Sequence, residues 1–381
     1  MGEIQLSVQE LFAMPENSYQ LVDIRDERAR SYGVIPGSVA LSAEELPESQ
    51  EIDKNKTVVI YCQKGERSVP AAEALQEAGV DAKSLNGGYL AWLMEAMKQK
   101  EEAKKEEETP EYLEIEQSIR KKFRKTIWCR FTRAVREYEL VKEGDKIAVS
   151  GGKDSMLMAK LFQELKRHNK FNFEVVFLVM DPGYSPANRQ IIEANAKRMN
   201  IPITIFESDI FDAVFNIEKS PCYLCARMRR GHLYSKAKEL GCNKIALGHH
   251  YDDVIETILM GMLYGAQMQT MMPKLHSTNF EGMELIRPLY LIREDDIKKW
   301  RDSNDLHFIQ CACKFTDTCS TCGGENTSKR VEVKNLIRQL KETNPFVESN
   351  IFKSVENVNL STVIAYKKDG VKHSFLEGYD D

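Results

Sequence analysis

Short apolar runs alternate with segments of helix length along most of the chain. In the first hundred residues, short apolar runs that predict strands lie at 19–25, 56–62 and 82–86. Two amphipathic patterns with helical spacing follow the second and third runs, at 68–79 and 88–99. This alternation is typical of a small α/β domain built on a parallel sheet.

A second series of apolar runs follows, again separated by segments of helix length. These runs lie at 146–152, 173–181, 201–208 and 242–250. They predict a second, larger α/β domain with a doubly wound parallel sheet. We see no repeat of one series in the other.

The two series are separated by residues 98–117, which are almost all Lys and Glu with one Pro. Such a composition predicts a solvated, partly helical linker. We therefore expect an N-terminal domain over 1–98, a charged linker over 99–117 and a second domain over 118–381. When extended, a linker of about 20 residues spans tens of Å, so the first domain can reach the second by moving on it.

Composition narrows the class of protein. The 381 residues are 42% hydrophobic and 29% charged, as expected for a globular chain with more than one core. No apolar run approaches the roughly 18 residues that cross a bilayer, and the N-terminus lacks the features of a signal peptide. We expect a cytoplasmic protein with no membrane contact. The nine cysteines, several spaced C-x-x-C, favour metal or redox chemistry over disulfides.

The first candidate site is Cys62, which ends an apolar run and precedes the loop Gln-Lys-Gly-Glu-Arg-Ser and a helix. Inward-pointing loop amides and the helix N-terminus would stabilise an anionic sulfur. The segments DIRDERARSYGVIPGS and LNGGYLAW flank this loop. Together the three segments resemble the rhodanese family over about residues 5–98.

The resemblance leaves open whether Cys62 attacks phosphorus or carries sulfur. Phosphatase relatives with this fold have five residues between the Cys and the Arg, whereas four separate Cys62 from Arg67. A tighter loop suits a single terminal sulfur. We therefore predict that Cys62 carries a persulfide and that Arg67 and the loop amides hold the sulfane sulfur. The alternative is a buried cysteine in an inactive rhodanese-like domain.

The second candidate site is the loop SGGKDS, which lies between an apolar strand and a helix. Glycines let a backbone approach phosphate, and the helix N-terminus and Lys153 add positive potential. The loop lacks the Walker A spacing. It resembles the signature of the ATP pyrophosphatases, which split ATP between its α and β phosphates and leave an adenylated intermediate. The resemblance implies that ATP and Mg²⁺ bind at Ser150, Gly151, Gly152, Lys153, Asp154 and Ser155; the alternative is a simple glycine turn.

Two later stretches, GHHYDD at 248–253 and IRPLYLIREDDI at 286–297, narrow the subfamily. With the loop they resemble the tRNA 2-thiocytidine synthetases over about residues 115–365. The resemblance implies that His249 lies near the nucleotide and that Asp181 contacts the adenosine. Asp252 and Asp253 then hold Mg²⁺ or orient the loop, or else serve as helix caps and ion-pair partners. The resemblance also implies that tRNA is a partner and that the chain forms a homodimer.

The third candidate site is a set of cysteines. Cys222 and Cys225 are spaced so that two thiolates can reach one metal, and CARMRRGHLY resembles the thiocytidine synthetases. In that family the pair and a third cysteine hold a [4Fe–4S] cluster whose fourth iron binds sulfide. Position after the run LHFIQ favours Cys311 or Cys313 as the third ligand, whereas the resemblance of CSTCGGENTSKR favours Cys319. Alternatively, the four cysteines at 311, 313, 319 and 322 form a structural zinc knuckle.

Residues 120–136 hold eight Lys or Arg and no acid, with Phe123, Trp128 and Phe131 among them. Since the net charge of the chain is −5, any contact with nucleic acid must rest on a local basic patch of this kind. The alternative, which is compatible with the first, is an amphipathic helix that packs its aromatic side on the domain. Arg227, Arg229 and Arg230 add positive charge beside the cysteine pair.

The three sites combine into one sulfur pathway. An upstream donor such as a cysteine desulfurase loads Cys62, ATP adenylates the C2 carbonyl of a tRNA base, and sulfur replaces AMP. The resemblance implies that the base is cytidine 32. Three alternatives stay open: another tRNA base, direct attack by a persulfide on Cys222 or Cys225 with a disulfide to Cys311, or a sulfur-trafficking protein that thiolates a small metabolite.

Overall fold

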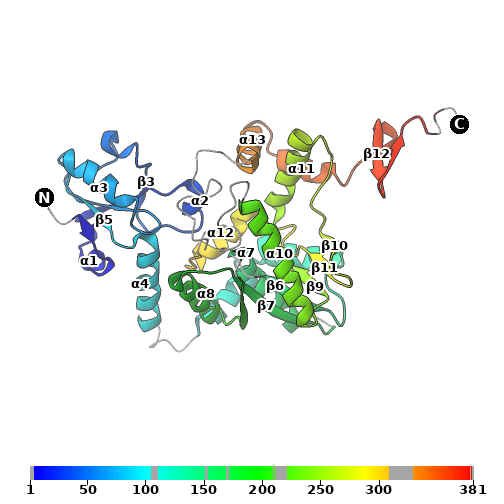
Figure 1. Cartoon of the computed structure of the whole chain (residues 1–381), viewed down its shortest axis with the longest axis horizontal. Helices are drawn as coiled ribbons and strands as arrows, with labels where there is room; N and C mark the ends of the chain where they lie inside the picture. Colours follow the sequence, from blue (N-terminus) through cyan, green and yellow to red (C-terminus); the bar gives the residue numbers. More distant parts are fainter. Residues whose placement is uncertain are drawn as a thin grey trace.

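The computed structural model describes residues 4–103, 110–150, 153–168, 171–208, 210, 221–308, 329–377 and 379. Two parallel sheets, each flanked by helices, form two units that lie side by side (Figure 1). The predicted fold class, two α/β domains of which the second is doubly wound, is confirmed.

The first sheet has five parallel strands in the order β1-β5-β4-β2-β3. Its strands are β1 (Gln5–Leu6), β2 (Tyr19–Asp23), β3 (Val39–Ala40), β4 (Thr57–Tyr61) and β5 (Ala82–Leu85). Its helices are α1 (Val8–Ala13), α2 (Glu27–Arg30), η1 (Leu46–Glu48), α3 (Ser68–Glu77) and α4 (Gly88–Ala103). The three predicted strands are present. The edge strands β1 and β3 are two residues long, too short to show a periodic pattern.

The second sheet has six strands in the order β10-β11-β9-β6-β7-β8, and all pairs except β10–β11 are parallel. Its strands are β6 (Lys146–Ser150), β7 (Glu174–Asp181), β8 (Ile203–Glu207), β9 (Lys244–Ala246), β10 (Lys274–His276) and β11 (Glu284–Ile286). The helices around it are α5 (Glu111–Arg120), η3 (Arg124–Trp128), α6 (Cys129–Glu137), α7 (Lys153–His168), α8 (Pro186–Arg198), α10 (Pro221–Glu239), α11 (Tyr251–Gly265), α12 (Glu294–Ser303), α13 (Lys329–Thr343) and α14 (Val347–Ser354).

The C-terminal part holds a short turn of helix and a two-stranded antiparallel hairpin, which extends away from the body in Figure 1. These elements are η4 (Leu360–Thr362), β12 (Ala365–Lys368) and β13 (Val371–Ser374). In the part of the chain that the structure describes, no helix is long and apolar enough to span a bilayer.

Much of the charged segment between the units is helical. Helix α4 continues to Ala103, and α5 begins at Glu111, where its first turn carries acidic side chains that suit a helix N-terminus. The position of the domain boundary at residue 98 stays a prediction. It falls within α4.

Each sheet reverses its strand order at one point, and the loops at these points position the candidate sites. In the first sheet the chain runs from β2 to β3 on one side and to β4 on the other. In the second, β6 leads to β7 and β8 on one side, and β9 lies on the other. Ligands of open α/β sheets bind at the carboxyl edge beside such a reversal. Cys62 follows β4, and the loop that begins at Ser150 follows β6.

Candidate active site

Cys62 lies in a tight loop that aims hydrogen-bond donors at its sulfur. The backbone N–H of Gly65 donates to Sγ at 3.2 Å, and the Ser68 hydroxyl lies 3.6 Å from it. Ser68 is itself held by Ser84 of β5 at 2.8 Å. Cys62 is buried, with 5% of its surface exposed, whereas Arg67 is exposed at the start of α3. Gly65 and Ser68 are therefore donors to the sulfur within the described residues.

Two glycines allow this loop to close against the start of α4. Gly65 and Gly88 both have positive φ angles, +88° and +58°. A Cβ atom on Gly65 would lie 2.7 Å from the backbone nitrogen of Gly87, and one on Gly88 would overlap the carbonyl oxygen of Cys62. That carbonyl accepts a hydrogen bond from the Tyr89 N–H at 2.9 Å. Only glycine fits both positions, so the loop and α4 form one rigid unit.

A buried ion pair supports the Cys62 loop from the neighbouring strand. Arg25 bonds Asp23 through two nitrogens, at 2.6 and 2.9 Å, and both side chains are almost fully buried. The guanidinium lies 3.9 Å from the ring centroid of Tyr89 and 3.4 Å from the amide oxygen of Gln63. Tyr61 completes the set through a hydrogen bond to Asp23 at 2.8 Å. Each charge is thus paired, as burial requires.

The carboxyl edge of the second sheet brings together loops that are far apart in the sequence. Ser150 ends β6, and Asp154 and Ser155 lie in the first turn of α7. A Cβ on Gly248, which follows β9, would lie 3.2 Å from the Asp154 Cβ and 3.4 Å from the Ser155 hydroxyl. The absence of a side chain at 248 therefore lets the loop after β9 touch the first turn of α7. Gly151, Gly152 and the Lys153 side chain lie outside what the structure describes.

Asp181 ends β7 at the same edge and shapes its loop. Its Oδ1 accepts hydrogen bonds from the backbone N–H groups of Gly183 and Tyr184, at 2.9 and 2.6 Å. Its Oδ2 lies 3.2 Å from Arg189. Both carboxylate oxygens are therefore engaged in holding the turn, and contact with adenosine stays a prediction for this residue.

His249 and Arg287 lie at the ends of the adjacent strands β9 and β11. Burial, together with the nearby cations Arg287 and Arg230, lowers the pKa of His249 to about 4. The imidazole is therefore neutral at pH 7. Arg287 is 9% exposed, and burial lowers the pKa of its guanidinium to about 10. The sequence placed Arg287 in the stretch IRPLYLIREDDI but gave it no role, because its burial at this edge has no pattern in the sequence.

Both side chains have unused hydrogen-bonding atoms. Arg287 donates to the carbonyl oxygen of Met272, but its Nε and the His249 Nδ1 are buried with no hydrogen-bond partner among the described residues. Nor does any carboxylate of the described chain form an ion pair with Arg287. A buried cation with an unpaired hydrogen-bond donor lowers the stability of the fold unless an anion binds to it. The edge therefore suits a phosphate-bearing ligand.

Asp252 and Asp253 have structural partners. Asp252 bonds Arg293 at 2.9 Å and accepts the N–H of Glu294 at 2.7 Å, which fixes the start of α12. Asp253 accepts the N–H of His250 at 3.0 Å in a capping box at the start of α11. Of the alternatives that the sequence left open, the contacts give both residues the capping and ion-pair roles.

The cysteine set is described in part. Cys222 and Cys225 lie three residues apart near the start of α10, and their side chains lie outside what the structure describes. The predicted ligands Cys311 and Cys313, like Cys319 and Cys322, lie outside the described residues. Within the described residues no group of three or more metal-ligating side chains occurs. Cys129 is exposed and Cys242 is buried, and both are free thiols.

The basic segment packs its aromatic side inward. Phe123 and Phe131 are buried in the core of the second unit, and Trp128 packs against it. Arg120 and Arg130 bond acidic side chains, Glu164 at 2.6 Å and Asp296 at 3.2 Å. The exposed cations Arg124, Lys125 and Arg136 lie outside these pairs. The alternative that the helix packs its aromatic side on the domain is thus confirmed. A smaller basic surface stays available for contact with nucleic acid.

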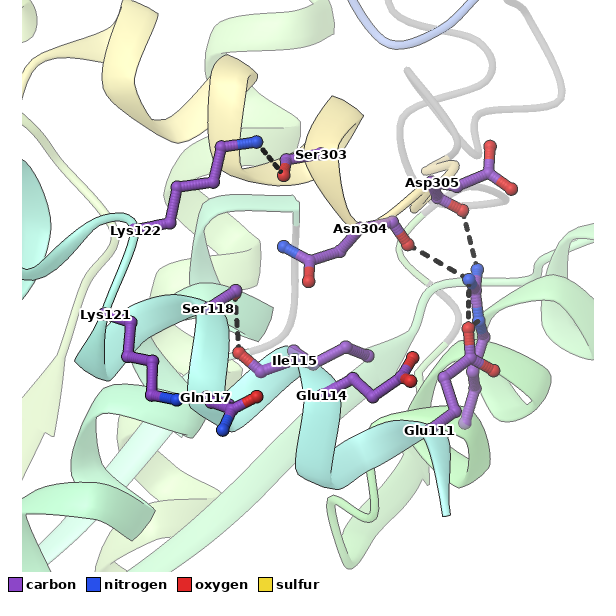
Figure 2. Close-up of a pocket in the computed structure, with 11 residues that line it drawn as sticks. Glu111, Glu114, Ile115, Gln117, Ser118, Lys121, Lys122, Ser303, Asn304 and Asp305 are labelled. Atoms are coloured by element: carbon purple, nitrogen blue, oxygen red, sulfur yellow. Dashed lines mark hydrogen bonds and ion pairs between the residues drawn. The ribbon is translucent and has the colours of Figure 1, made fainter. Parts of the chain in front are cut away.

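A pocket of about 480 Å³ lies apart from both carboxyl edges, between α5 and the turn that follows α12 (Figure 2). Arg198 crosses this junction: it bonds Glu111 at 2.7 Å and the carbonyl oxygen of Asp305 at 2.7 Å. Lys122 reaches the Ser303 hydroxyl at 2.6 Å (Figure 2). These internal bonds fasten the end of the charged segment to the second unit.

Comparisons with known proteins agree with this architecture. A PP-loop domain model matches residues 125–315, and a rhodanese-like domain model matches residues 7–95. A protein of Paraburkholderia xenovorans (strain LB400) named tRNA-cytidine(32) 2-sulfurtransferase is 34% identical over 239 residues, which cover 61% of this chain and 68% of that protein. A protein of the same name from Anaeromyxobacter sp. (strain K) is 33% identical over 230 residues, which cover 59% of this chain and 76% of that protein.

A solved structure, the U34-tRNA thiolase NcsA from Methanococcus maripaludis with its [4Fe–4S] cluster, is 22% identical with a TM-score of 0.47 and covers 61% of this chain and 79% of that chain. This likeness is too distant to bear on the site. The family models and the named relatives are sufficient by themselves to assign the chain to a family. The chain belongs to the PP-loop family of the tRNA-cytidine(32) 2-sulfurtransferases, and a rhodanese-like domain precedes its PP-loop domain.

Proposed function

We propose that this protein thiolates tRNA at C2 of cytidine 32 in an ATP-dependent reaction, with sulfur that its own rhodanese-like domain carries. The observation that carries the proposal is the meeting of the PP-loop helix with the Gly248–His249 loop at the strand-order reversal of the second sheet. The names of the relatives support the substrate, because they are tRNA-cytidine(32) 2-sulfurtransferases.

The first step activates the base. The C2 carbonyl oxygen attacks the α-phosphorus of ATP, pyrophosphate leaves, and AMP becomes a good leaving group at C2. The residues Ser150, Gly151, Gly152, Lys153, Asp154 and Ser155 cradle the phosphates at the N-terminus of α7. Arg287 supplies a buried cation for the charge that develops on them. His249 stays neutral, so its ring exchanges hydrogen bonds without adding charge.

The cofactors follow from the donor set. Cys222 and Cys225, spaced C-x-x-C near the start of α10, would hold an iron–sulfur cluster, with Cys311 or Cys313 as the third ligand. When bound, a [4Fe–4S] cluster supplies an iron at which sulfide binds. Mg²⁺ enters with ATP and neutralises phosphate charge. Sulfide delivered to the carboxyl edge of the second sheet attacks C2, AMP departs, and the base is left with a thiocarbonyl group.

The sulfur comes from Cys62. A donor such as a cysteine desulfurase leaves a persulfide there, and the Gly65 N–H and Ser68 hydroxyl stabilise its charge. The outer sulfur of a persulfide is sulfane sulfur, so its release as sulfide requires two electrons. A thiol reductant supplies them and ends as a disulfide.

The test uses purified protein, unmodified tRNA, MgATP and sodium sulfide, with nucleosides and AMP measured together. The proposal predicts 2-thiocytidine and AMP in equal amounts, with neither formed when ATP or tRNA is left out. AMP formation without a thiolated nucleoside, or a thiolated nucleoside other than 2-thiocytidine, would overturn it.

Replacing Arg287 with Gln should lower tRNA-dependent AMP formation by at least about tenfold, because the buried cation is lost from the phosphate site. The melting temperature should stay constant or rise, since this guanidinium has no acidic partner in the described chain. Arg287→Lys should recover part of the rate. Lys274→Gln, on the neighbouring β10, is the matched control. A normal rate for Arg287→Gln would remove Arg287 from the site.

The exposed cations Arg124 and Lys125 should contribute to tRNA binding. The double variant Arg124→Glu/Lys125→Glu should bind tRNA more weakly, and the slope of log K against log salt should fall by about one to two. Filter binding at several salt concentrations measures both quantities. Lys367→Glu/Lys368→Glu, on the C-terminal hairpin, adds the same charge elsewhere. An equal loss in both double variants would mean that net charge alone is responsible.

A further inference from the structure

The rhodanese-like domain packs against the PP-loop domain through an apolar contact. Ile191 of α8 is 1% exposed and lies in a core cluster whose other members all belong to the first unit. Beside it, the Trp92 ring of α4 meets the ring of His307 edge-on, with centroids 5.8 Å apart. The sequence predicted a tether between two units, and the structure adds a packed interface to it.

Polar contacts extend this interface to the loop that follows β2. Arg301 of α12 donates to the carbonyl oxygen of Ser31, and Arg338 of α13 lies 3.1 Å from Glu27. A Cβ on Gly33 would lie 3.3 Å from His307 Nδ1, so the Gly33 backbone approaches the His307 side chain closely there. Because β2 and β4 are parallel neighbours, the loop after β2 lies at the same edge as Cys62. The first unit therefore turns its Cys62 edge toward the PP-loop domain.

A short chain of contacts links this interface to Cys62. The N–H of Tyr89 holds the Cys62 carbonyl at 2.9 Å, and the ring of Tyr89 stacks on Trp92 with centroids 5.8 Å apart. Trp92 lies one helical turn after Tyr89 and touches His307. The reactive loop is thus fixed, through α4, to the surface that contacts the second unit.

The same interface lies at one end of the cysteine-rich segment. His307 precedes Cys311 by four residues, a distance of at most about 14 Å along an extended chain. The Asn195 side chain fixes this position by donating to the carbonyl oxygen of His307 at 2.8 Å. After the segment, Arg330 bonds Asp253 and Glu256 at 3.0 and 2.8 Å, in the first turns of the helix that follows His249. His307, which precedes the segment, therefore lies at the rhodanese interface, and Arg330, which follows it, lies beside the PP-loop edge.

From this juxtaposition we propose that the Ile191–Trp92–His307 interface positions Cys62 to pass its sulfane sulfur to a thiolate of the PP-loop domain within the same chain. This inference rests on the proposed function and identifies its positioning residues. A thiolate of the second domain attacks the outer sulfur of the Cys62 persulfide, the S–S bond breaks, and Cys62 leaves as a thiolate. The acceptor becomes the persulfide, so this transfer needs no oxidant or reductant.

The test opens the interface in the full-length protein with Ile191→Ser. Glu193→Ser, on the exposed face of the same helix, is the matched control, and Ile191→Leu is the conservative rescue. Each protein is loaded with ³⁴S-labelled thiosulfate, freed of donor, and quenched at intervals at low protein concentration. Peptide mass spectrometry then follows the label from Cys62 to cysteines of the second domain. Cyanide-dependent thiocyanate formation measures the rhodanese domain alone.

The proposal predicts that Ile191→Ser slows transfer by at least about tenfold, while thiocyanate formation and sulfide-supported tRNA thiolation stay at the wild-type rate. Ile191→Leu and Glu193→Ser should transfer normally. Normal transfer in Ile191→Ser overturns the proposal, and so does transfer that rises in proportion to protein concentration, since it would be intermolecular. Failure of the wild type to thiolate tRNA with sulfide overturns the proposed function instead, and the label transfer still decides the role of the interface.

Discussion

Replacing Cys62 with Ser is expected to abolish thiosulfate-supported tRNA thiolation, with a loss of at least about 100-fold. A hydroxyl can take the place of the thiol and keep the contact with the Gly65 N–H, but it cannot form a persulfide. Thiolation supported by free sulfide should stay within about twofold of the wild type, because the second site is untouched. The two sulfur sources, compared in one assay of thiolated nucleosides, separate carriage of sulfur from its insertion.

The control for this variant is Cys129→Ser, which removes an exposed thiol from α6. It should leave both rates unchanged. If Cys62→Ser used thiosulfate as well as the wild type, Cys62 would be excluded as the carrier. If it lost activity with sulfide too, the rhodanese-like domain would be acting on the second site by a route other than sulfur supply.

Replacing Cys222 with Ala should remove the metal centre. Protein purified without oxygen is expected to hold about four irons and four acid-labile sulfides per chain, and the variant less than about one of each. Thiolation should be lost with both sulfur sources, since the insertion site itself is affected. Thiocyanate formation at Cys62 should persist. Iron, sulfide and zinc analysis together with the two activity assays checks each part.

The same analysis applied to Cys311→Ala and Cys313→Ala identifies the third ligand, and Cys129→Ala is the control. Iron retained in Cys222→Ala would contradict the assignment of the centre to this pair. Zinc without iron in the wild type would favour the zinc-knuckle alternative, and sulfur would then have to pass by direct persulfide attack.

The sequence predicted the architecture well where apolar runs were long. The strands β2, β4, β6 and β7 each contain β-branched residues within an apolar run, and all four are buried at their centres. β11 could not be predicted in this way, because its three residues are too short for a period. Arg287, which follows β11, was given no role, because its burial at this edge has no pattern in the sequence.

The sequence was less able to separate contact with a ligand from contact with the fold. Asp181 and Asp252 were candidates for nucleotide or Mg²⁺ contact, and their oxygens also hold a turn and the start of α12; contact of Asp181 with adenosine stays a prediction. A carboxylate at the end of a strand or in the first turn of a helix suits either role, and the sequence does not show which N–H groups lie near it.

The interface between the units had no recognisable pattern in the sequence. Ile191 and Trp92 occupy ordinary apolar positions of amphipathic helices, and such positions look the same whether they face their own sheet or another domain. The charged segment predicted freedom between the units, because composition reports the solvation of a linker and carries no information on what its ends dock against.

The central claim, that one chain both carries sulfur and inserts it into tRNA, is tested most directly by a single turnover. Cys62 is loaded with ³⁴S from labelled thiosulfate, free donor is removed, and unmodified tRNA, MgATP and a thiol reductant are added together with unlabelled thiosulfate. The account predicts heavy 2-thiocytidine in an initial burst of up to about one per chain, absent in Cys62→Ser. Only light 2-thiocytidine from the first turnover onward would contradict it.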